Sequence, residues 1–185
     1  MATSMRELVE RARAGDRDAF AAFGAMHLDQ MYATAALMLH DRDMAEDAVQ
    51  EALIRAWRDL PALRDPSRAG AWLRRLLVRA CYDEARRRRR GVQPRLLHPM
   101  EEAVPDVQST FADRDVLDRA FRRLSVEHRA AIVLRHYLDL TVADVADAMR
   151  VPLGTGKSRL HHAERALRAA LEADARTAVA RGGGS

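Results

Sequence analysis

Cysteine is nearly absent from this chain of 185 residues, since Cys81 is the only one. No internal disulfide can form, and a lone thiol is typical of a reducing compartment, so we expect a cytoplasmic location. The sequence also contains no secretory signal and no apolar run of the roughly 18 residues that a membrane span requires. We therefore expect no membrane insertion.

Aromatic residues are scarce as well, at 5% of the chain, and runs of β-branched residues are nearly absent. β-strands favour both kinds of residue, so their scarcity disfavours sheet structure. The common residues are Ala, Leu, Arg, Asp and Glu, a mixture that favours helices. Apolar residues still make up 48% of the chain, which is enough for a hydrophobic core. The composition predicts an all-α protein.

Lysine occurs only once, as Lys157, so the basic side chains are almost all arginine. The net charge is +4 and the isoelectric point is near 9.9, which suits a polyanionic partner. The seven histidines show no spacing that pairs them with carboxylates or the thiol as metal ligands. No nucleophile–base pair is recognisable either. We predict no metal, no cofactor and no catalytic residue.

The chain divides by composition into two helical parts. Residues 91–113 contain three prolines and no sustained helical period, which predicts a flexible linker. Helical periodicity covers residues 16–90 and 114–175. A lead-in of residues 1–15 and a flexible tail of residues 176–185, ending in Gly-Gly-Gly-Ser, complete the chain. We expect two small helical domains joined by the linker.

The first domain contains a helix with two distinct faces. Asp43 followed by Glu46 is typical of a capping box and predicts the helix start, while Pro61 closes the helix. An apolar stripe recurs at helical spacing through Val49, Leu53, Ala56 and Leu60. A separate acidic face carries Asp47, Gln50 and Glu51.

A second helix is predicted over residues 71–90, after a polar loop. Its apolar positions are Trp72, Leu76 and Ala80, and we interpret Trp72 as part of the core. Arginines occupy the remaining faces and end in the run 86–90. Such a run is typical of an edge that contacts phosphates.

The second domain ends in a helix-turn-helix pattern. Thr141 and Asp144 form a capping box, and a short amphipathic helix follows over residues 142–149. A break at 151–154 precedes a long helix, predicted from about 155 to 171. Gly156 lies on its inward seam, where a side chain is missing, so we expect Gly156→Val to raise stability by about 1 kcal/mol.

The segment Gly156-Lys157-Ser158 matches the end of a phosphate-binding P-loop, but the rest of that motif is missing. The first glycine of the motif would be residue 151, which is valine, and the upstream segment is helical where the motif needs a strand. We therefore predict no ATP or GTP binding. The segment is better explained as the start of a recognition helix whose Lys157 and Ser158 face outward toward base edges.

The most specific signals are three stretches in fixed order: "DRDMAEDAVQEALIRAWRDL", "AWLRRLLVRACYDEARRRRR" and "LSVEHRAAIVLRHYLDLTVADVADAMRVPLGTGKSRLHHAERAL". Within them, DAVQEA, Arg-Ala-Trp and P-x-G-T-x-K-S-R-L are specific in combination. Together they resemble an extracytoplasmic-function (ECF) sigma factor of bacterial RNA polymerase, a member of the sigma-70 family. The likeness covers roughly residues 16–172.

The resemblance implies a DNA-binding specificity subunit rather than an enzyme. Its expected partners are core RNA polymerase, through the clamp of the largest subunit and the flap region, and promoter DNA. Many members are also held inactive by an anti-sigma factor. Region 2, here residues 16–90, binds the clamp and opens the −10 element. Region 4, here residues 114–175, reads the −35 element, and the linker runs through the RNA-exit path.

The resemblance also assigns roles to individual residues. The clamp contacts fall on Asp47, Gln50 and Glu51. The −10 contacts fall on the loop of residues 60–70, on Arg75 and Arg79, and on Arg86 at the edge. The −35 contacts fall on Arg135, Lys157, Ser158, His161, His162 and Arg165. Arg79 and Gly156 depart from the family, which often has asparagine and usually has valine at these two positions.

A stand-alone helix-turn-helix regulator is the alternative, with an N-terminal half that senses a ligand or a partner. The face formed by Asp47, Gln50 and Glu51 discriminates between the two functions, because such a regulator needs no surface for the polymerase clamp.

Overall fold

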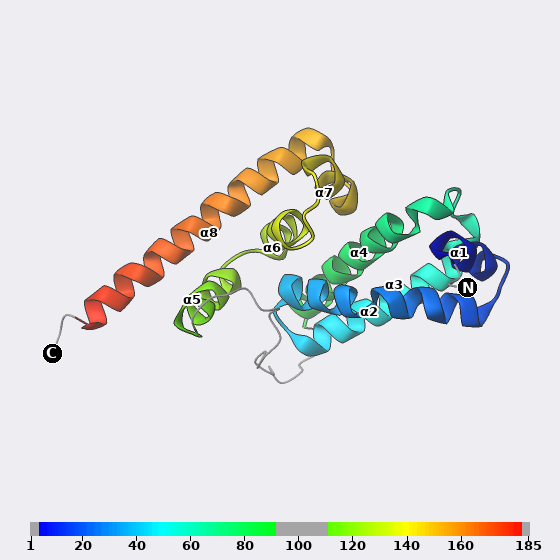
Figure 1. Ribbon diagram of the computed structural model, residues 1–185. Helices are drawn as coiled ribbons and strands as arrows, with labels where there is room; N and C mark the ends of the chain where they lie inside the picture. The colour runs from blue at the N-terminus through cyan, green and yellow to red at the C-terminus, as the bar shows by residue number, and fades with distance from the viewer. Residues whose placement is uncertain (1–3, 92–110, 183–185) are drawn as a thin grey trace. The chain divides into compact units, whose positions relative to one another are not determined.

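The computed structural model describes residues 4–91 and 111–182, and every regular element in these two ranges is helical (Figure 1). The chain divides into two compact units, one built mainly from the helices before residue 102 and the other mainly from those after it. Most of the predicted linker, residues 92–110, lies outside the described residues, as do residues 183–185. None of the helices in the described ranges is long and apolar enough to cross a membrane.

The first unit is a bundle in which α2, α3 and α4 pack against one another, with α1 packed on α2. Its elements are α1 (Met5–Arg13), α2 (Arg17–Leu39), α3 (Arg42–Asp59), the 3₁₀ turns η1 (Leu60–Ala62) and η2 (Pro66–Arg68), and α4 (Ala69–Arg89). Short polar side chains cap the first three helices, because Ser4, Asp16 and Asp41 each accept a hydrogen bond from a backbone amide in the first turn. Residues 1–15, expected as a lead-in, therefore contain a packed helix.

The predicted start of α3 at Asp43 is wrong. Asp41 is the cap, and its Oδ1 accepts a hydrogen bond from the Met44 amide at 3.0 Å. The preceding residue, His40, adopts a left-handed conformation with φ 58°, so α2 ends and α3 begins within two residues. Asp41 is buried and its other oxygen pairs with Arg88 of α4, which fixes the start of α3 against the end of α4.

The predicted inward face of α4 is correct only at Ala80, which is fully buried. The buried positions include Leu73, Leu77 and Cys81, whereas Trp72 and Leu76 are only half-buried. The true seam lies one residue further along, a rotation of about 100°. The interpretation of Trp72 as a core residue is therefore not supported. Cys81 is fully buried, as expected for a small packed residue, and burial raises the pKa of its thiol.

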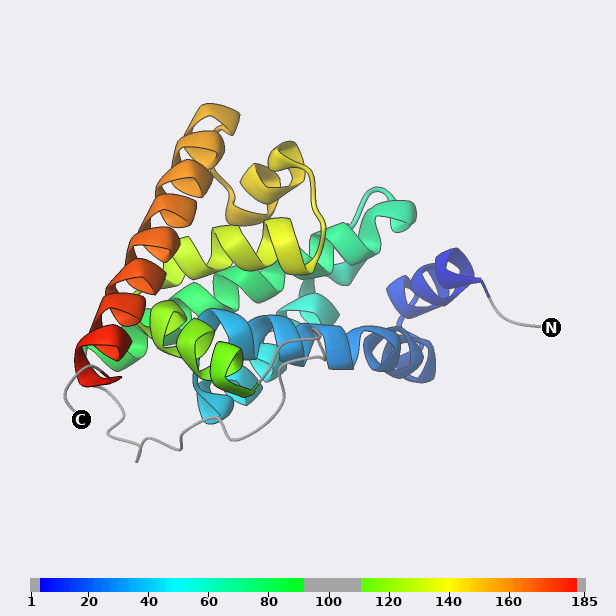
Figure 2. The ribbon, with the colours of Figure 1, turned by 60° about the vertical axis from the view of Figure 1, so that its left-hand side comes forward.

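The second unit places the long helix α8 beside α5 and α6 (Figure 2). Its elements are α5 (Phe111–Arg122), α6 (Val126–Ile132), a π-helical segment η3 (Val133–Tyr137), α7 (Val142–Met149) and α8 (Leu153–Gly182). The predicted capping box is confirmed, because the Asp144 amide donates to the Thr141 hydroxyl at 3.2 Å. The helix-turn-helix is therefore formed by α7, a turn at residues 150–152, and α8.

Helix α8 extends beyond its predicted end near residue 171, and residues 176–182, expected as a flexible tail, belong to it. Asp174 explains part of the extension. It is buried, and its carboxylate pairs with Arg119 of α5 at 3.5 Å and with Arg123, the residue after α5, at 2.6 Å. This part of α8 therefore packs on the first helix of the unit.

Gly156 is buried on the inward seam of α8, as predicted, but the expected gain from Gly156→Val is wrong. A Cβ atom at this position would lie 2.7 Å from the Cβ of Ala146 and 3.2 Å from its Cα. Carbon atoms normally approach to about 3.5–4.0 Å. The missing side chain is therefore a requirement of the close approach between α7 and α8, not an unfilled space.

Candidate polymerase and promoter interfaces

The outer face of α8 is basic and open. The predicted −35 residues of this helix, Lys157, Ser158, His161, His162 and Arg165, are all exposed, while Gly156, Leu160 and Ala163 are buried beneath them. The helix is thus held by its apolar seam and presents its polar side chains to solvent. This arrangement is the one that a recognition helix needs to enter the major groove.

The exposed side chains of α8 divide into two rows. Ser158, His162 and Arg165 line a shallow hollow of about 680 Å³, which is also lined by His128 of α6 and by Thr155 and Arg159. Lys157 and His161 are one turn apart and do not line this hollow. No carboxylate contributes to the hollow, so its electrostatic character favours an anion.

Leu153 extends the second row, because it precedes Lys157 by one turn. Its side chain is 48% exposed, and the neighbouring Gly154 has no atom within 4 Å of the position of a Cβ. The outward side of the first turn of α8, at Leu153 and Gly154, is therefore uncovered by the described parts of the chain. The sequence analysis did not identify Leu153, although its place in the helix-turn-helix was a usable signal.

Arg135 lies apart from these rows, in the π-helical segment η3. Its guanidinium donates to the carbonyl of Leu140 at 3.2 Å and contacts the carboxylate of Asp139 at 3.4 Å. These bonds brace the corner that leads into α7. The side chain keeps 37% of its surface exposed, so a phosphate can still approach it.

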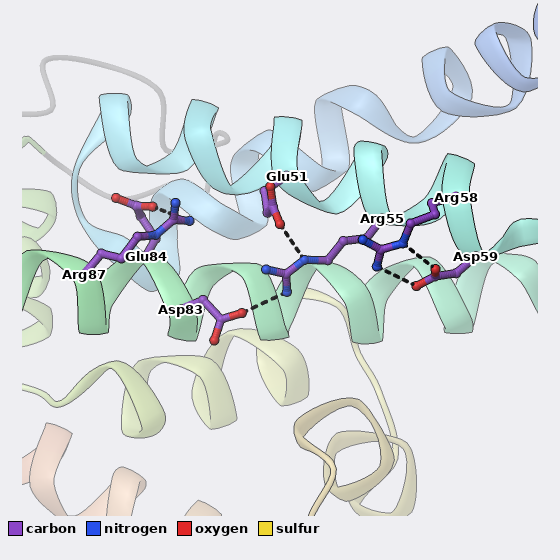
Figure 3. A network of polar contacts seen from close by, with 7 residues as sticks. All are labelled: Glu51, Arg55, Arg58, Asp59, Asp83, Glu84 and Arg87. Carbon is purple, nitrogen blue, oxygen red and sulfur yellow. Dashed lines mark hydrogen bonds and ion pairs between the residues drawn. The ribbon is translucent and has the colours of Figure 1, made fainter.

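The acidic face of α3 is less open than the sequence suggested. Gln50 is exposed, but Asp47 and Glu51 are only half-exposed. Glu51 accepts a bond from Arg55 at 2.7 Å, and Arg55 also donates to Asp83 of α4 at 2.8 Å (Figure 3). Glu51 is therefore part of a network between α3 and α4, and the description of three freely exposed side chains is corrected.

Burial and ion pairing shift the pKa values of two groups in this part of the first unit. Burial lowers the pKa of Arg55, but its hydrogen bonds to Asp83 and Glu51 outweigh this effect and raise the pKa overall. Elsewhere on α4, burial raises the pKa of Glu84, although its pair with Arg87 at 2.8 Å opposes the shift. The charges of Asp47 and Asp41 raise the pKa of Glu84 further.

An apolar groove adjoins Gln50 on the other side of α3. It has a volume of about 700 Å³ and lies between α2 and α3. Leu28, Ile54 and Trp57 line it and are 43%, 54% and 37% exposed. Phe20 contributes a ring that meets Trp57 edge-on, with centroids 5.0 Å apart. The groove was not predicted from the sequence, because its walls come from two helices and include Val49 and Leu53 of the predicted apolar stripe.

The predicted −10 arginines lie along α4. Arg75 is half-buried, whereas Arg79 and Arg86 are exposed, and their spacing puts all three on one side of the helix. The terminal arginine run is not uniform. Arg87 pairs with Glu84, and Arg88 pairs with Asp41, so these two contribute to the fold of the unit.

One unit presents an exposed basic helix-turn-helix, which is typical of a DNA-binding transcription factor. The other presents an apolar groove beside a polar helix face, which is typical of a surface for a protein partner. Residues 25–91 match the family Sigma-70 region 2, and residues 114–167 match Sigma-70, region 4. The chain belongs to the ECF sigma factors of the sigma-70 family. It is an alternative sigma factor, which directs promoter-specific transcription, and the match to region 2 disfavours the stand-alone regulator.

Two curated relatives are similar to this protein over most of its length. It is 33% identical over 166 residues to the ECF RNA polymerase sigma factor SigM of Mycobacterium tuberculosis, covering 89% of this chain and 83% of SigM. It is 36% identical over 151 residues to SigL of the same organism, covering 79% and 85%. Among solved structures, the sigma factor RpoE in complex with the anti-sigma factor NepR from Bartonella quintana is similar, with 29% identity, a TM-score of 0.64, and coverage of 81% and 94%.

Proposed function

We propose that this sigma factor acts in the cytoplasm, where it binds the clamp and flap region of core RNA polymerase and reads a two-part promoter. Residues 16–90 would form the part that binds the clamp and the −10 element, and residues 114–175 the part that reads the −35 element. Residues 91–113 would link them through the RNA-exit path. The open basic face of α8, supported by a buried seam, is the observation that carries this proposal.

The clamp interface combines Gln50 with the groove beside it. Asp47 and Glu51 supply half-exposed carboxylates at one edge, and the exposed Ile54 and Trp57 supply apolar surface at the other. Protein interfaces are commonly anchored by large apolar side chains surrounded by a polar rim. The groove therefore extends the three residues assigned by resemblance into a surface large enough for a partner helix.

The −10 interface consists of the loop of residues 60–70 and the arginine side of α4. Arg75, Arg79 and Arg86 would follow the phosphates, and the loop would hold a base flipped out of the stack. Flipping costs a few kcal/mol of unstacking, so the loop must be positioned in advance of the base. Arg79 replaces the asparagine that the family often has, which should change the base preference.

The −35 interface uses the two rows of α8 for different tasks. Lys157 and His161, with Leu153, would face base edges, since an apolar side chain can contact the methyl group of thymine. Ser158, His162 and Arg165 would face phosphates at the hollow, with Arg135 as a further phosphate contact. Phosphate contacts fix the register of a protein on DNA, while base contacts supply sequence specificity.

An anti-sigma factor is a further expected partner. RpoE, which is 29% identical to this chain, was solved in complex with the anti-sigma factor NepR. An exposed apolar groove in a free sigma factor is a surface that such an inhibitor could cover.

Transcription reconstituted from purified components tests this function. The protein is added to core RNA polymerase on a fragmented genomic DNA library, and the DNA upstream of each transcript start is sequenced. We expect starts with shared −10 and −35 elements that are absent with core enzyme alone. Transcripts without any shared upstream sequence would contradict the proposal.

A further inference from the structure

The first helix of the chain lies outside the part that matches region 2, which begins at residue 25. Helix α1 is nevertheless well formed, since Ser4 caps it and an Arg6–Glu10 ion pair of 2.9 Å spans its exposed face. The centre of its inner face is buried, because Val9 has no exposed surface and Ala12 only 2%. Because these side chains are buried, α1 has a defined position on the elements that it contacts.

Those neighbours include both 3₁₀ turns of the loop of residues 60–70. Helix α1 packs on α2, on η1 and on η2, close to where the loop enters α4 (Figure 1). Arg6 also lies within the electrostatic reach of Asp65, the residue that caps η2. One short helix therefore contacts the loop at two separate points.

The loop has little structure of its own to hold it in place. Each turn is three residues long, and such short 3₁₀ turns have weak hydrogen-bond geometry. The backbone bonds include those from the Leu63 amide to the Leu60 carbonyl, at 3.0 Å, and from the Arg68 amide to the Asp65 carbonyl, at 3.1 Å. Asp65 adds a local cap, since its Oδ1 accepts from the Ser67 amide at 3.0 Å and from the Ser67 hydroxyl at 2.6 Å. The position of the loop therefore depends on the helices that pack against it.

We propose that α1 is a positioning element for the loop that captures the −10 base, and that the burial of Val9 holds α1 in place. This inference rests on the proposed role of the loop of residues 60–70 in base capture. Helix α1 need not touch DNA in this role. It holds η1 and η2 in the arrangement that receives the flipped base, so that the loop does not have to order itself when the promoter opens.

The test uses the full-length protein with core RNA polymerase and the variant Val9→Ala, which removes two methyl groups from the buried face of α1. Met38→Ala is the matched control. Met38 is equally buried but lies near the far end of α2. Helix α2 is about 34 Å long and α1 about 13 Å, so α1, which is joined to the start of α2, does not extend to Met38. Both variants are measured where circular dichroism shows them folded.

Transcription is measured on two promoter libraries, one varied at −10 and the other at −35, and core binding is measured in parallel. We expect Val9→Ala to reduce the preference among −10 bases by about tenfold, since a misplacement of about 1 Å in an oriented site can cost up to about 100-fold. The −35 preference and the core affinity should be unchanged, and Met38→Ala should alter neither preference. An unchanged −10 preference in Val9→Ala would overturn the inference.

A second variant keeps the test decisive if Val9→Ala does not fold. Arg6→Glu lies on the exposed face of α1 and reverses a charge within the electrostatic reach of Asp65, while it also removes the Arg6–Glu10 pair. It should weaken −10 preference in the same direction, though less, and an unchanged preference would again overturn the inference. If the wild-type protein itself shows no −10 preference while still binding core, the proposed role of the loop fails, and this outcome is distinguishable from a failure of the variants alone.

Discussion

Replacement of Gly156 by alanine should destabilise the second unit, although alanine is the better helix former. The gain in helix propensity is about 0.8–1 kcal/mol. Against it, the new Cβ would lie 2.7 Å from the Cβ of Ala146, so α7 and α8 must separate by about 1 Å. Overpacking of this kind costs about 1–3 kcal/mol. We expect a net loss of about 1 kcal/mol, equivalent to about 4–8 °C in Tm for a unit of this size.

The assay can assign the loss to the correct unit. Both tryptophans, Trp57 and Trp72, belong to the first unit, so tryptophan fluorescence follows that unit alone, while far-UV circular dichroism follows both. Gly154→Ala is the matched control, since its Cβ would meet nothing within 4 Å, and it should be neutral or stabilising. If Gly156→Ala raises the midpoint of the transition seen only by circular dichroism, the close approach of α7 and α8 is not a constraint.

Three further outcomes are expected. Glu84→Gln should stabilise the first unit at neutral pH, because burial raises the pKa of Glu84. The free energy of unfolding of the wild type, relative to that of Glu84→Gln, should fall as pH rises from about 4 to 7. A difference between the two proteins that stays constant across that range would refute this. Asp47→Ala combined with Gln50→Ala should weaken binding to core polymerase without loss of helix content by circular dichroism; unchanged affinity would remove the clamp assignment. Leu153→Ala should bind DNA with thymine at the contacted −35 position more weakly than the wild type does, and should lose little further affinity when uracil, which lacks the methyl group, replaces that thymine. If Leu153→Ala weakens binding to the thymine and uracil DNAs equally, a methyl contact is excluded.

The sequence predicted the architecture well because its local signals agree with one another. Helix-forming composition, a proline-containing break and the Thr141 capping box all indicate two helical parts and a helix-turn-helix, and the structure confirms these features. The outward face of α8 was also predictable. Its seam residues recur every three or four positions, so the polar residues between them must lie on the opposite side of the helix.

Finer features were not predictable, because they depend on contacts between helices. Helix α4 is apolar over a wide arc, so periodicity could not distinguish a seam through Trp72 from one through Leu73. Two aspartates, Asp41 and Asp43, were both plausible caps for α3, and the left-handed end of α2 decides between them. The role of Gly156 follows from the position of a residue on another helix, which helix propensity does not contain.

Separating base readout from backbone attraction on α8 tests the central claim most directly. Transcription by core polymerase with wild-type, Lys157→Ala or Arg165→Ala protein is measured across a −35 library at two salt concentrations. Lys157→Ala should relax the preference at one position, at a cost of about 1–3 kcal/mol for the preferred base. Arg165→Ala should weaken all promoters alike and reduce the salt dependence by about one counterion. If Lys157→Ala instead scales every promoter by the same factor, Lys157 contacts a phosphate and the assignment of base readout to it is wrong.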